Sequence, residues 1–138
     1  MDKKYIIVVQ CDIVMERCSG YFCEYAFSKR IDMFQAYSQK QDIRFLTITC
    51  SGCCGRAVQR KLEHLIKKVK AKEQIEKNEI VVHLASCITN DNHHGPPCPH
   101  LEYIRMLIVD RLKLEVQDGT KISMLAESRR EEGIYKNP

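Results

Sequence analysis

The sequence predicts an α/β domain built in three layers, with helices on both sides of a small, mainly parallel sheet. Short apolar runs alternate with longer amphipathic segments along most of the 138 residues. Strands that alternate with helices in this way form right-handed βαβ units, and such units build parallel sheets. The chain contains no linker and no internal repeat, so residues 1–138 are expected to form a single domain around one core.

The first half of the chain predicts two strands, each followed by a helix. Residues 5–10 are a nearly continuous apolar run, as expected for a strand that is buried on both faces. Residues 21–39 have helical spacing of apolar side chains and predict the first helix. Residues 43–49 are rich in β-branched and aromatic residues and predict the second strand. Residues 55–72 repeat apolar positions with the period of an amphipathic helix.

The second half continues the same alternation. Residues 80–84 predict a third strand, and the polar, proline-rich residues 89–99 predict a loop. Residues 101–112 predict a third helix, and residues 113–117 a fourth strand that stops at an Asp-Gly pair. The segment from about residue 123 to 138 is predicted to be a C-terminal tail. About four strands with flanking helices correspond to a Rossmann-like or flavodoxin-like fold.

A cysteine follows each of the first three predicted strands. Cys11 comes directly after the first strand, Cys50 after the second and Cys87 shortly after the third. Because the carboxyl ends of parallel strands meet at one edge of the sheet, ligands of such folds bind there. Three thiols are therefore predicted to converge at this edge, and thiolates are strong ligands for zinc and iron.

The turn from Cys50 to Cys53 is the centre of the predicted site. A gap of two residues lets both sulfurs reach one ion, at about 2.3 Å for zinc. Gly52 and Gly55 permit a tight turn, and the start of the following helix stabilises negative charge on sulfur. The sequence does not assign a role to Cys18, Cys23 or Cys54.

A second dense group of ligands lies in the segment His93-His94-Gly95-Pro96-Pro97-Cys98-Pro99-His100. Prolines restrict the backbone, so this loop is predicted to present its ligands rigidly. Cys98, His94 and His100 are candidate metal ligands beside Cys11, Cys50, Cys53 and Cys87. Two other histidines are expected outside the site: His83 as a hydrogen-bonded core residue and His64 on the surface.

Composition and the N-terminal segment lead us to expect a cytoplasmic protein. Hydrophobic residues make up 44% and charged residues 29%, as in ordinary globular domains. No run approaches the roughly 20 apolar residues of a membrane span, and no signal-peptide cleavage site follows residues 5–10. The net charge of +4 comes without a basic stripe interleaved with aromatic residues, so neither nucleic acid nor a membrane is an expected partner. Eight cysteines in a cytoplasmic chain indicate metal binding or thiol chemistry rather than structural disulfides.

The same residues resemble the CGGC domain family, small bacterial and archaeal proteins that are rich in cysteine and histidine. Cys50-Ser51-Gly52-Cys53 is similar to the Cys-Gly-Gly-Cys that names the family, with Ser51 in place of the first glycine. The segments His83-Leu84-Ala85-Ser86-Cys87 and 91–100 also resemble family blocks, and the similarity extends over about residues 5–120. The resemblance implies a metal-binding domain with zinc as the ion, and it leaves the downstream role undefined.

Alternative functions remain open at this point. An iron–sulfur cluster would use the same thiolates as zinc, and thiol–disulfide exchange at Cys50 and Cys53 would need no metal. Cys50 and Arg56 are separated by five residues, the spacing of the phosphate loop in cysteine phosphatases and arsenate reductases, in which a thiolate attacks and an arginine binds the oxygens. Whether the protein is an enzyme, and whether it binds a small molecule or a protein partner, stays undecided.

Overall fold

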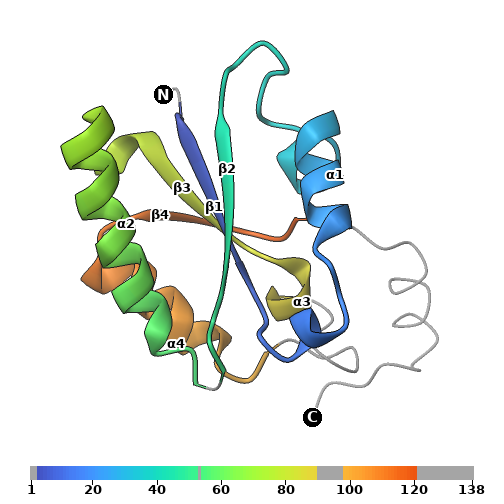
Figure 1. Cartoon of the computed structure of the whole chain (residues 1–138). Helices are drawn as coiled ribbons and strands as arrows, with labels where there is room; N and C mark the ends of the chain where they lie inside the picture. The colour runs from blue at the N-terminus through green and yellow to red at the C-terminus, as the bar shows by residue number, and fades with distance from the viewer. Residues whose placement is uncertain (1–2, 53, 90–97, 121–138) are drawn as a thin grey trace.

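The computed structural model describes residues 3–52, 54–89 and 98–120, and these form a parallel sheet between helices (Figure 1). All strand pairs in the described sheet are parallel, and the spatial order is β2-β1-β3-β4. This is the strand order of flavodoxin-like doubly wound folds, so the predicted fold class is confirmed. The strands are β1 (Tyr5–Gln10), β2 (Arg44–Thr49), β3 (Ile80–Leu84) and β4 (Glu115–Asp118).

Helices cover both faces of the sheet. The helices are α1 (Tyr21–Lys29), α2 (Ala57–Glu73), the single turn α3 (Ser86–Thr89) and α4 (Leu101–Met106), which continues as a π-helical turn over Leu107–Arg111. Figure 1 shows α2 and α4 on one side of the sheet and α1 on the other. In the described ranges, no helix has the length and apolar character needed to span a membrane.

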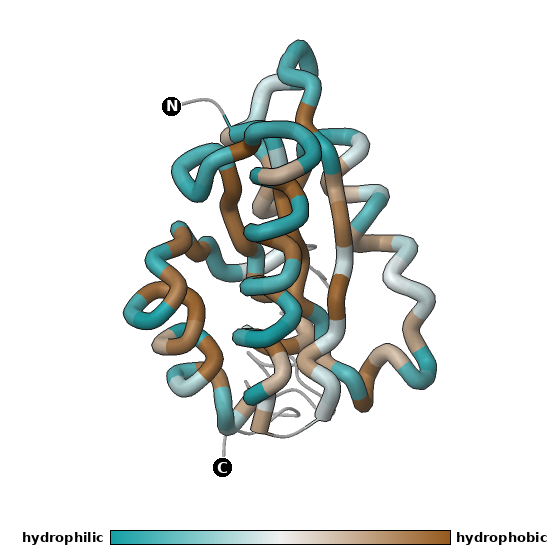
Figure 2. The backbone as a smooth tube through the Cα atoms, turned by 60° about the vertical axis from the view of Figure 1, so that its left-hand side comes forward, coloured by the Kyte–Doolittle hydropathy of each residue, from teal (hydrophilic) through white to brown (hydrophobic). Residues whose placement is uncertain are grey.

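The central strand β1 supplies side chains to two separate cores. All six of its residues are buried. Ile7 and Val9 pack in the cluster that includes side chains of α2 and α4, whereas Ile6 and Val8 pack in the cluster that includes α1. This alternation follows from the two-residue period of a strand. Figure 2 shows the apolar strands behind the largely hydrophilic outer surface of α2.

The first helix is shorter than the sequence predicts. Residues 21–39 were expected to be helical throughout, but α1 ends at Lys29 and a separate turn covers Asp32–Phe34. Arg30 takes the left-handed conformation, with φ 54°, and closes the helix in the way that C-terminal caps do. The interruption allows Phe34 to insert fully into the core beside Phe27. The apolar spacing that predicted a longer helix therefore includes a residue of the separate turn.

His83 is a buried core histidine, as the sequence predicts. Its Nδ1 lies 2.9 Å from the carbonyl oxygen of Gly119, and its Nε2 lies 2.8 Å from the Tyr37 hydroxyl. Because a carbonyl can only accept, Nδ1 carries the proton and Tyr37 donates to Nε2. Burial is the main cause that lowers the pKa of His83, and burial together with Glu115 raises the pKa of Tyr37 to about 12.

We expect the buried neutral His83 to make the protein less stable in mild acid. The pKa of His83 is lower in the folded state than in the unfolded chain, so the unfolded chain binds the proton more tightly. The contribution of His83 to the free energy of unfolding is therefore complete above about pH 6.5 and is lost as the pH falls below that value. The melting temperature of the wild type should therefore fall more between pH 7.5 and 5.5 than that of His83→Gln. Equal pH dependence in the two proteins would contradict this role for His83.

Candidate functional site

The carboxyl ends of three neighbouring strands bring three predicted thiols to one edge of the sheet. The Cys50 amide donates to the carbonyl of Gln10 at 2.9 Å, so Cys50 lies beside the end of β1, where Cys11 follows. Cys87 lies in α3, immediately after β3, and its Sγ accepts a hydrogen bond from the Cys11 amide at 3.3 Å. Cys11, Cys50 and Cys87 therefore all lie at this edge of the sheet.

A cavity of about 100 Å³ opens at this edge. Cys11 and Cys50 line it from the strand ends, and Cys98 and His100 line it from the segment that precedes α4. Its remaining walls are largely apolar, with Ile88 and Ile104 almost fully buried. Four of the predicted ligands, from three separate parts of the chain, thus share one cavity.

Backbone amides are directed at several of these sulfurs. The amide of Asp12 donates to Cys50 Sγ at 3.4 Å, in addition to the bond from Cys11 to Cys87 Sγ. A third amide, that of His100, donates to Cys98 Sγ at 3.4 Å. Hydrogen bonds of this kind favour a sulfur that carries negative charge, and a negatively charged sulfur is the form that binds metals.

The loop after Cys50 depends on its glycines. Gly52 and Gly55 have φ of 96° and 87°, and Ser51 also lies in the left-handed region at 60°. The Gly55 amide donates to the Gly52 carbonyl at 2.8 Å, which closes a tight turn. A Cβ on Gly55 would lie 2.7 Å from two carbons of Ile104. Glycine at this position therefore lets the Cys50 loop pack directly on α4.

Two of the predicted ligands, Cys53 and His94, lie outside the described residues. Among residues 3–52, 54–89 and 98–120, no group of three or more cysteine, histidine, aspartate or glutamate side chains lies close enough together to hold a metal ion. Cys53 stands between Gly52 and Cys54 in the chain, and both of these residues line the cavity.

Cys54 lines the cavity although the sequence assigned it no role. The sequence could have indicated this role, because Cys54 follows Cys53 in a loop that contains glycines. Such a loop can reverse direction and bring neighbouring side chains to the same site. The other two unassigned cysteines lie elsewhere: Cys18 is exposed, and Cys23 Sγ lies 3.2 Å from the Thr120 hydroxyl.

Two observations bear on the alternative functions: the hydrogen bonds within the Cys50 loop, and the absence of disulfides among the described cysteines. Ser51 donates its amide to the Thr49 hydroxyl at 3.3 Å, and Gly55 donates to Gly52, so two amides that would surround a phosphate are engaged within the chain. The seven described cysteines carry thiols, and no disulfide joins any two of them.

Comparison with known proteins gives one match. The model of the CGGC domain family matches residues 5–121, a range that contains every residue of the cavity. The comparisons with curated proteins and with solved structures find no match.

Proposed function

The chain belongs to the CGGC domain family, and we therefore propose that it is a metal-binding protein whose ion is zinc. The proposed ligands are drawn from the cysteines at the strand ends and from the segment before α4. Our first choice is Cys11, Cys50, Cys53 and Cys87, with Cys98, His94 and His100 as competing or neighbouring ligands.

One observation carries the proposal: Cys11, Cys50, Cys98 and His100 line the same small cavity. Thiolate and imidazole are the donors that zinc prefers, and a structural zinc site needs only four of them. The volume of about 100 Å³ suits an ion, because pockets for organic ligands of ordinary size begin at about 300 Å³.

Hydrogen bonding supports the same proposal. The amides that donate to Cys50 Sγ and Cys87 Sγ would also donate to these sulfurs around a bound ion, as outer-shell partners do in metal sites. A cytoplasmic location, which we also propose, would keep the thiols reduced and available.

An iron–sulfur cluster is the second candidate for the same site, because the cavity wall supplies several thiols and cysteine thiolates also hold such clusters. Elemental analysis and visible absorption of protein purified without oxygen would separate the two. A colourless protein with stoichiometric zinc supports the first, and a brown, iron-containing protein supports the second.

We expect added zinc to stabilise the metal-free protein. An ion that binds only the folded state contributes about 2.7 kcal/mol at a concentration 100 times its Kd, which corresponds to a rise in melting temperature of about 10 °C for a domain of this size. Thermal unfolding with and without zinc measures the effect, and a chelator should reverse it. The absence of stabilisation by zinc and by iron, in a protein purified without either, would contradict the proposal.

A further inference from the structure

A groove of about 550 Å³ runs between α2 and the edge strand β2, away from the cysteines. Its floor is apolar and consists of Leu46 and Ile48 from β2 with Leu65 and Val69 from α2. Leu46 is 36% exposed, which is unusual for a side chain on the helix-covered face of a sheet. The groove therefore offers apolar surface that a partner can bury.

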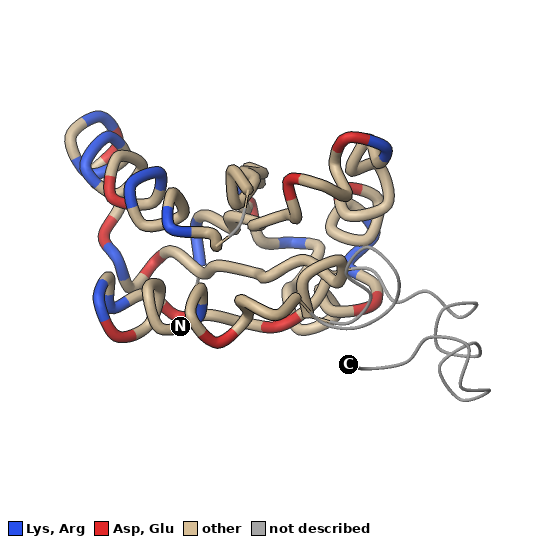
Figure 3. The backbone as a smooth tube through the Cα atoms, turned by 90° about the horizontal axis from the view of Figure 1, so that it is seen from below, with Lys and Arg blue, Asp and Glu red and all other residues tan. Residues whose placement is uncertain are grey.

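The rim of this groove is basic. Arg60, His64 and Lys68 follow one another at intervals of four residues, so they form one stripe along α2. Lys61 joins them, and its Nζ donates to the Thr49 carbonyl at 2.8 Å. The described residues that line the groove include no aspartate or glutamate. Figure 3 shows lysine and arginine gathered along α2.

The strand beside the groove has an unpaired edge in the described part of the chain, because β2 is the outermost strand of the sheet. The amides of Arg44 and Cys50 donate towards β1, to the carbonyls of Lys4 and Gln10. Since alternate residues of a strand direct their amides to the same neighbour, those of Phe45 and Thr47 face outward. They are able to pair with an added strand.

We propose that this groove docks an extended acidic segment of a partner protein, which adds to the sheet along β2. Main-chain hydrogen bonds to Phe45 and Thr47 would give affinity, as in other cases of strand addition. Side chains of the added strand that face α2 would place apolar groups over Leu46 and carboxylates beside His64 and Lys68. The charge of the rim selects an acidic segment over a basic or neutral one.

Other occupants fit the groove less well. Pairing of two copies through β2 would bring their basic stripes together, and like charge at an exposed edge is a known means of preventing self-association. Single-stranded nucleic acid is bound by aromatic platforms, whereas the floor here is aliphatic. This inference is independent of the metal, because none of the groove residues lines the cysteine cavity.

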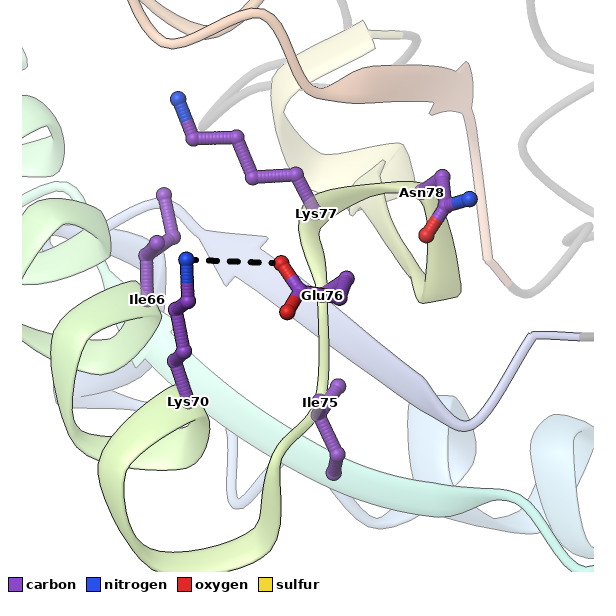
Figure 4. A pocket seen from close by; sticks show the side chains of 6 residues that line it. All are labelled: Ile66, Lys70, Ile75, Glu76, Lys77 and Asn78. Atoms are coloured by element: carbon purple, nitrogen blue, oxygen red, sulfur yellow. Dashed lines mark ion pairs between the residues drawn. The ribbon is translucent and has the colours of Figure 1, made fainter.

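The opposite flank of α2 supplies a matched control. There Lys70 lies 3.7 Å from Glu76 in a separate pocket of about 420 Å³ (Figure 4). Both residues of this ion pair are largely exposed, and such pairs contribute little to stability. Lys70→Glu therefore changes the net charge of the protein by the same amount as Lys68→Glu, on the same helix, without touching the groove.

Fluorescence anisotropy of the full chain with a labelled peptide tests the proposal. The probe Glu-Thr-Val-Thr-Glu-Thr-Val-Thr-Glu presents glutamate and valine on one face of a strand, and a second peptide replaces each glutamate with lysine. We expect saturable binding of the acidic peptide only. Lys68→Glu should weaken binding by about fivefold, Thr47→Pro by about fivefold through loss of an outward amide, and Lys70→Glu by less than about twofold.

Equal binding of both peptides, or an equal effect of Lys68→Glu and Lys70→Glu, would overturn the proposal. So would tighter binding of a thymidine oligonucleotide than of the acidic peptide, or a dimer in sedimentation that Thr47→Pro dissociates. If Thr47→Pro fails to fold, the comparison of Lys68→Glu with Lys70→Glu still tests the proposal. Both of these residues are exposed on α2, so neither substitution should prevent folding.

Discussion

Replacement of Cys50 with serine is expected to remove most of the bound zinc. Cys50 is buried at the end of β2, lines the cavity and accepts the Asp12 amide on its sulfur. A serine hydroxyl does not ionise at neutral pH and is a poor ligand for zinc. Because loss of an outer-shell partner alone costs about 10–100-fold in metal affinity, loss of a direct ligand should cost more.

Metal content after dialysis against a weak chelator, and competition with a zinc indicator, would measure this loss. Cys18→Ser is the matched control, because it removes one sulfur from an exposed position that does not line the cavity. Equal zinc affinity of the two variants would exclude Cys50 as a ligand. Turnover of a phosphate ester that Cys50→Ser abolishes would instead support the phosphatase alternative.

The second large effect is expected for Gly55→Val. The φ of 87° at this position strains any residue with a Cβ, and a β-branched one most of all. A Cβ would also lie 2.7 Å from two carbons of Ile104, which is 1% exposed and cannot move into solvent. Strain of about 1–3 kcal/mol combines with overpacking of about 1–3 kcal/mol, so we expect a loss of about 2–6 kcal/mol in unfolding free energy.

Gly52→Val separates these two contributions. Gly52 has a similarly positive φ of 96°, but a Cβ there would meet no atom within 4 Å. Urea unfolding of the metal-free proteins should therefore show a loss of only about 1–3 kcal/mol for Gly52→Val and a larger one for Gly55→Val. Equal losses would indicate that the contact between the Cys50 loop and α4 does not constrain the fold.

The α/β alternation could be predicted because local patterns determine it. The apolar run at β1 and the 3.6-residue period at α2 reflect burial in a sheet and on a helix face, and both appear in the structure at nearly the predicted bounds. The first helix was predicted too long, because its periodicity continues into the buried Phe34 beyond the left-handed residue Arg30. A backbone reversal at arginine has no reliable signal in one sequence.

The order of residues was enough to predict that thiols follow three strands and that a parallel sheet directs them to one edge. This inference needed only the order of elements and the rule that carboxyl ends of parallel strands align. The positions of Cys11 and Cys50 at neighbouring strand ends agree with it. Strand positions are predictable to this degree because hydrogen bonding between strands leaves few alternative arrangements.

The loop residues that share the cavity could not be identified from the sequence and emerge from the three-dimensional packing. Cys54, Cys98 and His100 line the cavity. Their positions could not be predicted, because they depend on how two loops pack against Ile104 and Ile88. The exposed edge of β2 beside a basic stripe on α2 was also invisible in the sequence, because it depends on which strand is outermost. Packing between distant segments sets these features, and its energy depends on shape in three dimensions rather than on local pattern.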